Sequence, residues 1–315
     1  MDRLAGWSSR LHAEWAERLR TETGTDVEYW TCGGVYLARS TGEVAALAGL
    51  TEAWRDEQIP FEILDESTLR ARLGRQFRSA SHPQLAVFNP IEAQIRNPYF
   101  LKTLRMAIEL RGGKLIENAG AIRLEAQAGR IARIHSESAG VIEPDQVCIA
   151  AGAWSYELLQ TAGINLPVEP VRGQMVLFKL PELPFECIVN EGSRYLVPRQ
   201  DGYVLAGSTM EQVGFDCSTT EPEIDELIAF AESLFPILNR GNVVNQWAGL
   251  RPASYDGLPY IGRLPGLSNA VVATGHLRSG LQLAPATANL IADLFAGIES
   301  HELLTLLNRG RVSHH

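Results

Sequence analysis

The chain has 315 residues, of which 45% are hydrophobic and 21% are charged, and this length suits one large domain or two interlocked ones. Its formal net charge is −9 and it has no long basic run, which argues against a nucleic-acid partner and a membrane-surface role. No apolar stretch approaches the roughly 20 residues that a membrane helix needs.

The N-terminal half alternates between helical and strand-like patterns. Leu4, Trp7, Leu11 and Trp15 recur at three- and four-residue steps, which predicts a helix that ends at Gly24. The patterns farther along predict helices over 43–58 and 98–111, and strands over 27–30, 34–40, 84–88, 114–119, 121–127 and 130–138.

The C-terminal half is richer in strands. The pattern predicts strands over 147–151, 171–180, 187–191, 193–199, 202–208, 243–254 and 269–274, helices over 154–163, 221–235 and 280–295, and a turn over 256–263. Because helical and strand units are interleaved without a linker, we expect an α/β or α+β fold with two interlocked lobes.

Two glycine-containing turns link a predicted strand to a predicted helix. In VCIAAGAWS the strand ends near Gly152, and in GHLRSG the residues His276 to Gly280 lead into the last helix. Such turns let the backbone approach a flat ligand, and a helix start carries free N–H groups and a partial positive charge. A tight turn at Gly152 and a plain helix cap with solvent-facing Arg278 and His276 are the alternatives.

Arg251 lies in an otherwise apolar strand end, in the stretch WAGLRPASYDG. A buried arginine is costly unless it is paired, and its planar fork suits a carboxylate. The partner is either a substrate carboxylate or an internal acid such as Asp256. Tyr195, on the predicted strand SRYLVPR, either contacts a ligand or packs in the core.

Together, GLRPASYDGLPYIGR and GHLRSGLQLAPATANLIADL resemble the C-terminal part of FAD-dependent amino-acid oxidases of the D-amino-acid oxidase type, in particular the glycine oxidases of thiamine biosynthesis. The likeness extends through GGVYLA, the KLIENA–AIRLE pair, AAGAWS, VRGQM, YLVPR and WAGLRP in the family's order. The C-terminal motifs are specific, whereas the N-terminal ones are loose.

The resemblance implies a division of the chain. It predicts an FAD-binding domain with a parallel sheet, from residues 1–25, 85–168 and 248–315, and a substrate domain on a mostly antiparallel sheet, from residues 26–84 and 169–247. The family normally opens with strand–GxGxxG–helix and a strand that ends in an acidic residue. This sequence begins at the following helix, so we expect an N-terminally truncated FAD-binding domain.

The resemblance also assigns roles to residues. Arg251 would hold the substrate carboxylate, Tyr195 would flank the substrate, and Arg278 would lie between the flavin and the substrate. The residues that would contact FAD are Ala121, Gly152, Trp154, His276, Leu277, Arg278, Ser279, Gly280, Leu281 and Gln282. No catalytic general base is assigned, because the flavin is the electron sink. No cysteine follows Cys217, so non-covalent FAD is expected.

The activity that the resemblance implies is oxidation of a small amino acid or amine, such as glycine, sarcosine or a D-amino acid, with reduction of oxygen to hydrogen peroxide. Two alternatives stay open: a dehydrogenase of the same fold that passes electrons to a carrier, and an inactive fragment. Four scattered cysteines without C-x-x-C predict a cytoplasmic protein with reduced thiols, and no His/Cys cluster suggests a metal. The sequence leaves open whether the protein forms a homo-oligomer.

Overall fold

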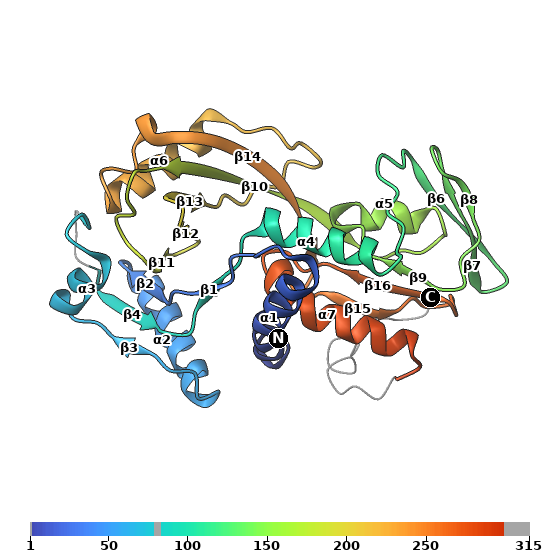
Figure 1. The fold of residues 1–315 in the computed structure, drawn as a ribbon, viewed down its shortest axis with the longest axis horizontal. Helices are drawn as coiled ribbons and strands as arrows, with labels where there is room; N and C mark the ends of the chain where they lie inside the picture. Colours follow the sequence, from blue (N-terminus) through green and yellow to red (C-terminus); the bar gives the residue numbers. More distant parts are fainter. Residues whose placement is uncertain (1, 79–82, 299–315) are drawn as a thin grey trace.

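A large curved sheet lies at one side of the molecule and a small sheet lies at the opposite end, with helices between them (Figure 1). The computed structural model describes residues 2–78 and 83–298. The large sheet has eight strands in the order β14 (Val243–Ser254), β10 (Val168–Lys179), β13 (Tyr203–Gly207), β12 (Arg194–Pro198), β11 (Ile188–Glu191), β2 (Gly34–Ala38), β4 (Leu85–Asn89) and β3 (Glu62–Ile63).

All neighbours in this sheet are antiparallel except β11 and β2, which confirms the expected mostly antiparallel sheet. Its longest ladder joins β10 and β14, where Gly173 faces Gly249 and Val171 faces Arg251. Side chains alternate between the two faces of a strand, and Val176 and Phe178 of β10, Leu196 of β12, and Val204 and Ala206 of β13 lie in one buried apolar core. Helices α3 (Glu66–Leu73) and α6 (Glu221–Leu234) contribute leucine, isoleucine and phenylalanine side chains to the same core.

Three strands form the sheet beside the last helix, in the order β15 (Tyr260–Arg263), β16 (Ala270–Thr274) and β9 (Val147–Ile149). β16 and β9 are parallel, as expected, but β15 is antiparallel to β16, so this sheet is mixed. Residues 260–263, predicted as part of a turn, form β15 because their backbone pairs with β16. Two smaller sheets pair β1 (Trp30–Thr31) with β5 (Ala93–Gln94), and β6 (Ile122–Gln127) with β7 (Arg130–Ser136) and β8 (Gly140–Ile142).

Helix α7 (Gly280–Phe295) has the predicted bounds and packs against α1 (Asp2–Thr23). Leu283, Leu290 and Leu294 of α7 lie in one buried cluster with Leu4 of α1 and Val271 of β16. The other helices are α2 (Thr41–Asp56), α4 (Asn97–Leu110) and α5 (Ser155–Gln160), and the short 3-10 turns are η1 (Gly152–Trp154) and η2 (Arg240–Asn242). The α/β architecture predicted from the sequence is therefore confirmed.

Some local predictions were wrong. The segment 114–119 forms no strand, and its apolar residues Leu115 and Ile116 are 38% and 42% exposed. The sheet of β6 and β7 has β8 as its third strand, which was not predicted. The division of the chain into two domains stays a prediction. Two segments that it assigns to the FAD-binding domain, β4 and residues 248–254 of β14, pair within the large sheet.

Candidate active site

The turn between β16 and α7 is tied to the end of β14. The Leu277 N–H donates to the Pro252 carbonyl at 2.7 Å, and His276 forms a β-bridge with Ala253. Gly275 has a φ of 76°, a backbone conformation that favours glycine. Helix α7 begins directly afterwards at Gly280, and Ser279 makes no side-chain cap to its first turn. This helix start therefore offers N–H groups and a positive dipole end to a ligand.

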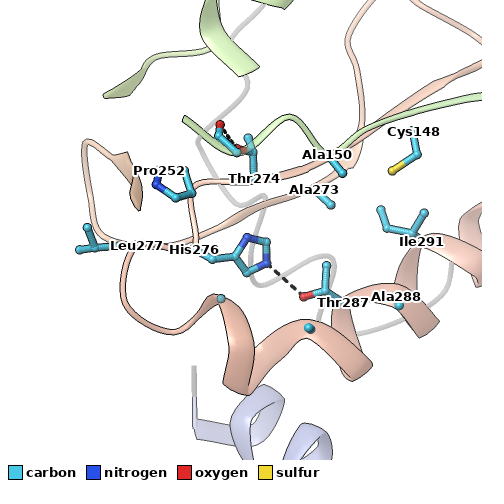
Figure 2. Close-up of a pocket in the computed structure, with 13 residues that line it drawn as sticks. Cys148, Ala150, Pro252, Ala273, Thr274, His276, Leu277, Thr287, Ala288 and Ile291 are labelled. Atoms are coloured by element: carbon cyan, nitrogen blue, oxygen red, sulfur yellow. Dashed lines mark hydrogen bonds between the residues drawn. The ribbon is translucent and has the colours of Figure 1, made fainter. Parts of the chain in front are cut away.

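A cavity of about 430 Å³ opens between this helix start, β16 and β9 (Figure 2). Its walls are mostly small or apolar, and they include Gly152, Pro252, Thr274, Leu277 and Gly280. The volume lies within the range of small-molecule sites. Thr274 donates its hydroxyl to the Gly152 carbonyl at 3.0 Å, so the turn after β9 and the end of β16 form one wall.

His276 lines the cavity and hydrogen-bonds through Nε2 to the Thr287 hydroxyl of α7 at 3.1 Å (Figure 2). Burial lowers its pKa to about 4, because a desolvated imidazolium is disfavoured. The ring is therefore neutral at neutral pH. It supplies a hydrogen-bonding group to the cavity wall and no positive charge.

We expect the free energy of unfolding to fall as the pH drops from about 6.5 toward 4. The unfolded chain protonates His276 near pH 6.5, whereas the folded chain does so only near pH 4, so protons favour the unfolded state in this window. His276 contributes about 1–2 kcal/mol of this loss between pH 7 and 5. Urea unfolding at both pH values measures it, and the His276→Gln variant should lose correspondingly less. An equal pH dependence in the variant would contradict this assignment.

Three predicted substrate residues lie near one another. Arg251 of β14 is partly buried, and its Nη1 donates to the Thr209 carbonyl at 2.9 Å. Burial lowers the pKa of Arg251, the positive charge of Arg278 lowers it further, and Tyr195 acts in the opposite direction. Tyr195 extends its hydroxyl to the Met175 sulfur at 3.6 Å, and Arg278 donates from Nη2 to the Ser193 carbonyl at 2.9 Å.

Arg251 has no carboxylate partner among residues 2–78 and 83–298. The alternative partner Asp256 instead accepts from the Leu258 N–H at 3.1 Å and from the Ser254 hydroxyl at 3.4 Å, within its own turn. Pro252, which follows Arg251, lines the cavity. The guanidinium of Arg251 thus has the Thr209 carbonyl and no acidic group as its partner among the described residues.

The predicted FAD contacts separate into two groups. Gly152, His276, Leu277 and Gly280 line the cavity, whereas the others do not. The Leu281 and Gln282 carbonyls face His12 of α1, whose Nε2 lies 2.9 and 3.2 Å away. Ala121 is hydrogen-bonded through its backbone to Glu137, and Trp154 packs near Phe215, with ring centroids 5.7 Å apart. The second group also includes Arg278 and Ser279.

Sequence reasoning missed the residues that hold Arg251. Gly173 of β10 packs against the guanidinium, since a Cβ on Gly173 would lie 2.1–2.2 Å from Nη1, Nη2 and Cζ. An isolated glycine inside an apolar strand is a sign of such a close approach, so VRGQM carried a usable signal. Nothing local marked Thr209, whose contact is made by its carbonyl.

The family model described as "FAD dependent oxidoreductase" (DAO) matches residues 1–294. The chain belongs to this family of FAD-dependent oxidoreductases. The protein is therefore an FAD-dependent enzyme, as the sequence predicted. The part of the chain that the structure describes contains no helix long and apolar enough to cross a membrane. It also contains no group of three His, Cys, Asp or Glu residues that could hold a metal ion.

Relatives of this chain include glycine oxidases and a bifunctional protein. The chain is 39% identical over 300 residues to glycine oxidase of Pseudomonas putida, covering 94% of this chain and 79% of that protein. It is 31% identical to the bifunctional protein ThiO/ThiG of Nostoc sp., covering 97% of this chain and 46% of that protein. The crystal structure of glycine oxidase from Geobacillus kaustophilus superposes with a TM-score of 0.88 at 29% identity, over 98% of this chain and 82% of the other.

Proposed function

We propose that the protein oxidises glycine or a similarly small amino acid or amine, with Arg251 as the residue that binds the substrate carboxylate. Oxygen is the electron acceptor in this proposal, and the products are hydrogen peroxide and an imine that hydrolyses to a 2-oxo acid and an amine or ammonia. The sequence relatives named as glycine oxidases support the substrate class. We place the enzyme in the cytoplasm, consistent with four cysteines that are all free.

The observation that carries the proposal is the unpaired Arg251 fork. A guanidinium that is partly buried loses hydration and needs an anionic partner to recover it. The described residues supply a single carbonyl. A substrate carboxylate can complete the pairing with two parallel N–H···O bonds, which also orients the substrate. Tyr195 and Arg278, which interact electrostatically with Arg251, lie where they can flank the same ligand.

The cavity residues fit the flat ring of a flavin. Glycines at 152 and 280 place no side chain in the cavity, and the lining is mostly apolar, as an aromatic ring requires. The first N–H groups of α7 carry no side-chain cap and favour negative charge that develops on a ring beside them. When bound, FAD would supply the chemistry by accepting two electrons and one proton from the substrate as a hydride.

The chain's own residues have simpler tasks. Arg251 binds and orients the carboxylate, and His276 stays neutral and holds α7 through Thr287. Small side chains at Ala273, Ala284 and Ala288 keep polar groups away from the cavity and thereby limit water. No described group needs to form a covalent bond to the substrate.

Peroxide formation tests the proposal. The purified protein, supplied with FAD and glycine in air, is expected to release hydrogen peroxide and glyoxylate in equal amounts. A same-fold dehydrogenase would reduce an artificial electron carrier but release no peroxide. Flavin that stays oxidised under anaerobic conditions with glycine, sarcosine and small D-amino acids would contradict the proposal, and failure to bind any flavin would favour the inactive-fragment alternative.

A further inference from the structure

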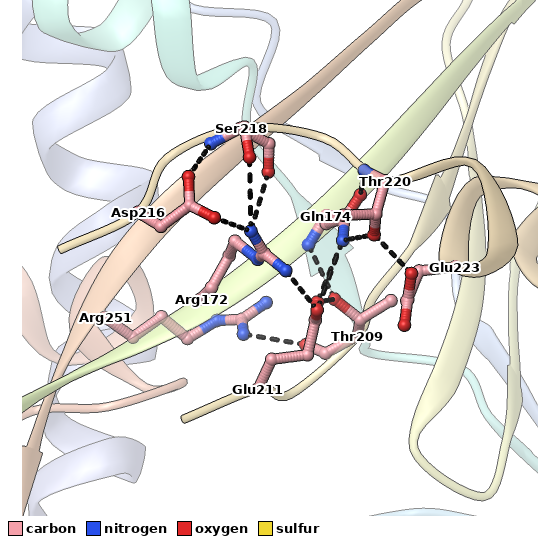
Figure 3. A network of polar contacts seen from close by, with 9 residues as sticks. All are labelled: Arg172, Gln174, Thr209, Glu211, Asp216, Ser218, Thr220, Glu223 and Arg251. Carbon is pink, nitrogen blue, oxygen red and sulfur yellow. Dashed lines mark hydrogen bonds and ion pairs between the residues drawn. The ribbon is translucent and has the colours of Figure 1, made fainter. Parts of the chain in front are cut away.

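A buried polar network fixes the segment after β13 onto β10, next to Arg251 (Figure 3). Its two central members on β10 are Arg172, which is 3% exposed, and Gln174, which is 0% exposed. Arg172 donates from Nη1 to Asp216 at 2.7 Å, and Gln174 exchanges hydrogen bonds with Thr220 at 2.7 and 2.9 Å. None of these residues was predicted to act in the site.

Glu211 is the acceptor on which the network converges. One carboxylate oxygen accepts from Arg172 Nη2 at 2.6 Å, and the other accepts from Gln174 Nε2 at 3.0 Å and from the Thr209 hydroxyl at 2.5 Å. The backbones of Glu211 and Arg172 also exchange two hydrogen bonds, of 2.8 and 3.0 Å. Burial by itself raises the pKa of Glu211, but its hydrogen bonds with Arg172, Thr209 and Gln174 hold the pKa below the ordinary value, so the group is ionised.

Thr209 connects this network to the candidate substrate site. Its hydroxyl donates to Glu211 and accepts from the Gln174 N–H at 2.9 Å, while its carbonyl accepts from Arg251 Nη1 at 2.9 Å. Met210, between Thr209 and Glu211, approaches Arg278, with its sulfur 3.9 Å from Nη1. A three-residue segment therefore contacts both arginines that face the proposed substrate.

We propose that Glu211 is a positioning residue of the carboxylate site: by anchoring Thr209 to β10, it sets the direction of the Arg251 guanidinium. This inference rests on the proposed role of Arg251. Without the Glu211 carboxylate, the Thr209 hydroxyl keeps only the hydrogen bond from the Gln174 backbone N–H, so the Thr209 carbonyl fixes one nitrogen of the fork less firmly. Bidentate binding requires both guanidinium nitrogens of Arg251 to point at the substrate carboxylate. A misdirected guanidinium therefore lowers the affinity for the carboxylate, while the chemical step is preserved.

The test measures carboxylate binding and turnover separately in the FAD-loaded protein. Glu211→Gln is expected to raise KM for glycine and Kd for acetate, measured by calorimetry, by about tenfold, with kcat within a factor of two. Thr209→Val removes only the hydroxyl branch; it should shift both constants in the same direction and serves if Glu211→Gln does not fold. Glu223→Gln, in the same network but on the Thr220 branch, is the control and should leave Kd for acetate unchanged.

A double-mutant cycle separates positioning from a general structural effect. If Glu211 acts through Arg251, then Glu211→Gln changes Kd for acetate much less in the Arg251→Lys background than in the native one. Fully additive effects, or an unchanged Kd in Glu211→Gln and Thr209→Val, would overturn the inference. An unchanged Kd in Arg251→Lys alone would instead refute the underlying role of Arg251, so the two failures are distinguishable.

Discussion

Replacing Arg251 by lysine is expected to raise KM for glycine about 10- to 150-fold, with flavin content retained. Lysine keeps the positive charge but loses the planar fork, so one of the two hydrogen bonds to the carboxylate disappears. A charge-assisted hydrogen bond contributes about 1.5–3 kcal/mol, which corresponds to this range. Steady-state kinetics with glycine, together with the flavin-to-protein absorbance ratio, measures both quantities.

The control for this substitution is Arg123→Lys. Arg123 lies exposed on β6, away from the cavity, so this variant carries the same chemical change without a role in the site. Its kinetic constants should equal those of the native enzyme. If KM for glycine were unchanged in Arg251→Lys as well, the guanidinium would be only a structural partner of the Thr209 carbonyl.

Gly173→Ala is expected to weaken substrate binding about 10- to 100-fold with little loss of stability. The added Cβ would lie 2.1–2.2 Å from the Arg251 guanidinium, so that group must move. The guanidinium is the end of a flexible side chain, and it can swing aside at small cost to the fold. A displaced guanidinium nevertheless loses one of its two charge-assisted hydrogen bonds to the carboxylate, which weakens binding by about 1.5–3 kcal/mol.

Gly249→Ala is the matched control for Gly173→Ala. Gly249 lies opposite Gly173 on the β14–β10 ladder, yet a Cβ on Gly249 would meet no atom within 4 Å. Both variants remove a strand glycine, so both should slightly stabilise or leave unchanged the free energy of unfolding in urea. Only Gly173→Ala should raise KM. Equal KM values in the two variants would mean that Arg251 tolerates the displacement.

The sequence determined those features whose signals are local. Helix α7 has the predicted bounds because an apolar stripe at three- and four-residue steps follows a glycine turn. The strands β10, β13 and β16 were also predicted, since each contains an apolar run bounded by turn residues. By contrast, the two-residue strands β3 and β5 have no pattern of their own, and of the strand predicted over 27–30 only Trp30 is in a strand, β1. These short strands exist only through pairing with another strand.

Long-range pairing likewise decided between competing strand predictions. Residues 114–119 are apolar enough to suggest a strand, but Leu115 and Ile116 remain exposed, and β7 pairs instead with β6 and β8. Residues 260–263 read as part of a turn because Asp256 and Gly257 are turn formers, yet β16 supplies the hydrogen bonds that make them a strand.

In the proposed site, the sequence indicated which residues to consider, and the tertiary structure decided how they are held. Arg251, Tyr195 and Arg278 were identified from motifs, and the alternative pairing with Asp256 stayed open until the turn at Leu258 was seen to use that carboxylate. Gly173, Thr209 and Glu211 lie 40 to 78 residues from Arg251 in the chain. Their effects arise from a missing Cβ, a carbonyl and a buried anchor, which act only once β10, β14 and the segment after β13 are packed together.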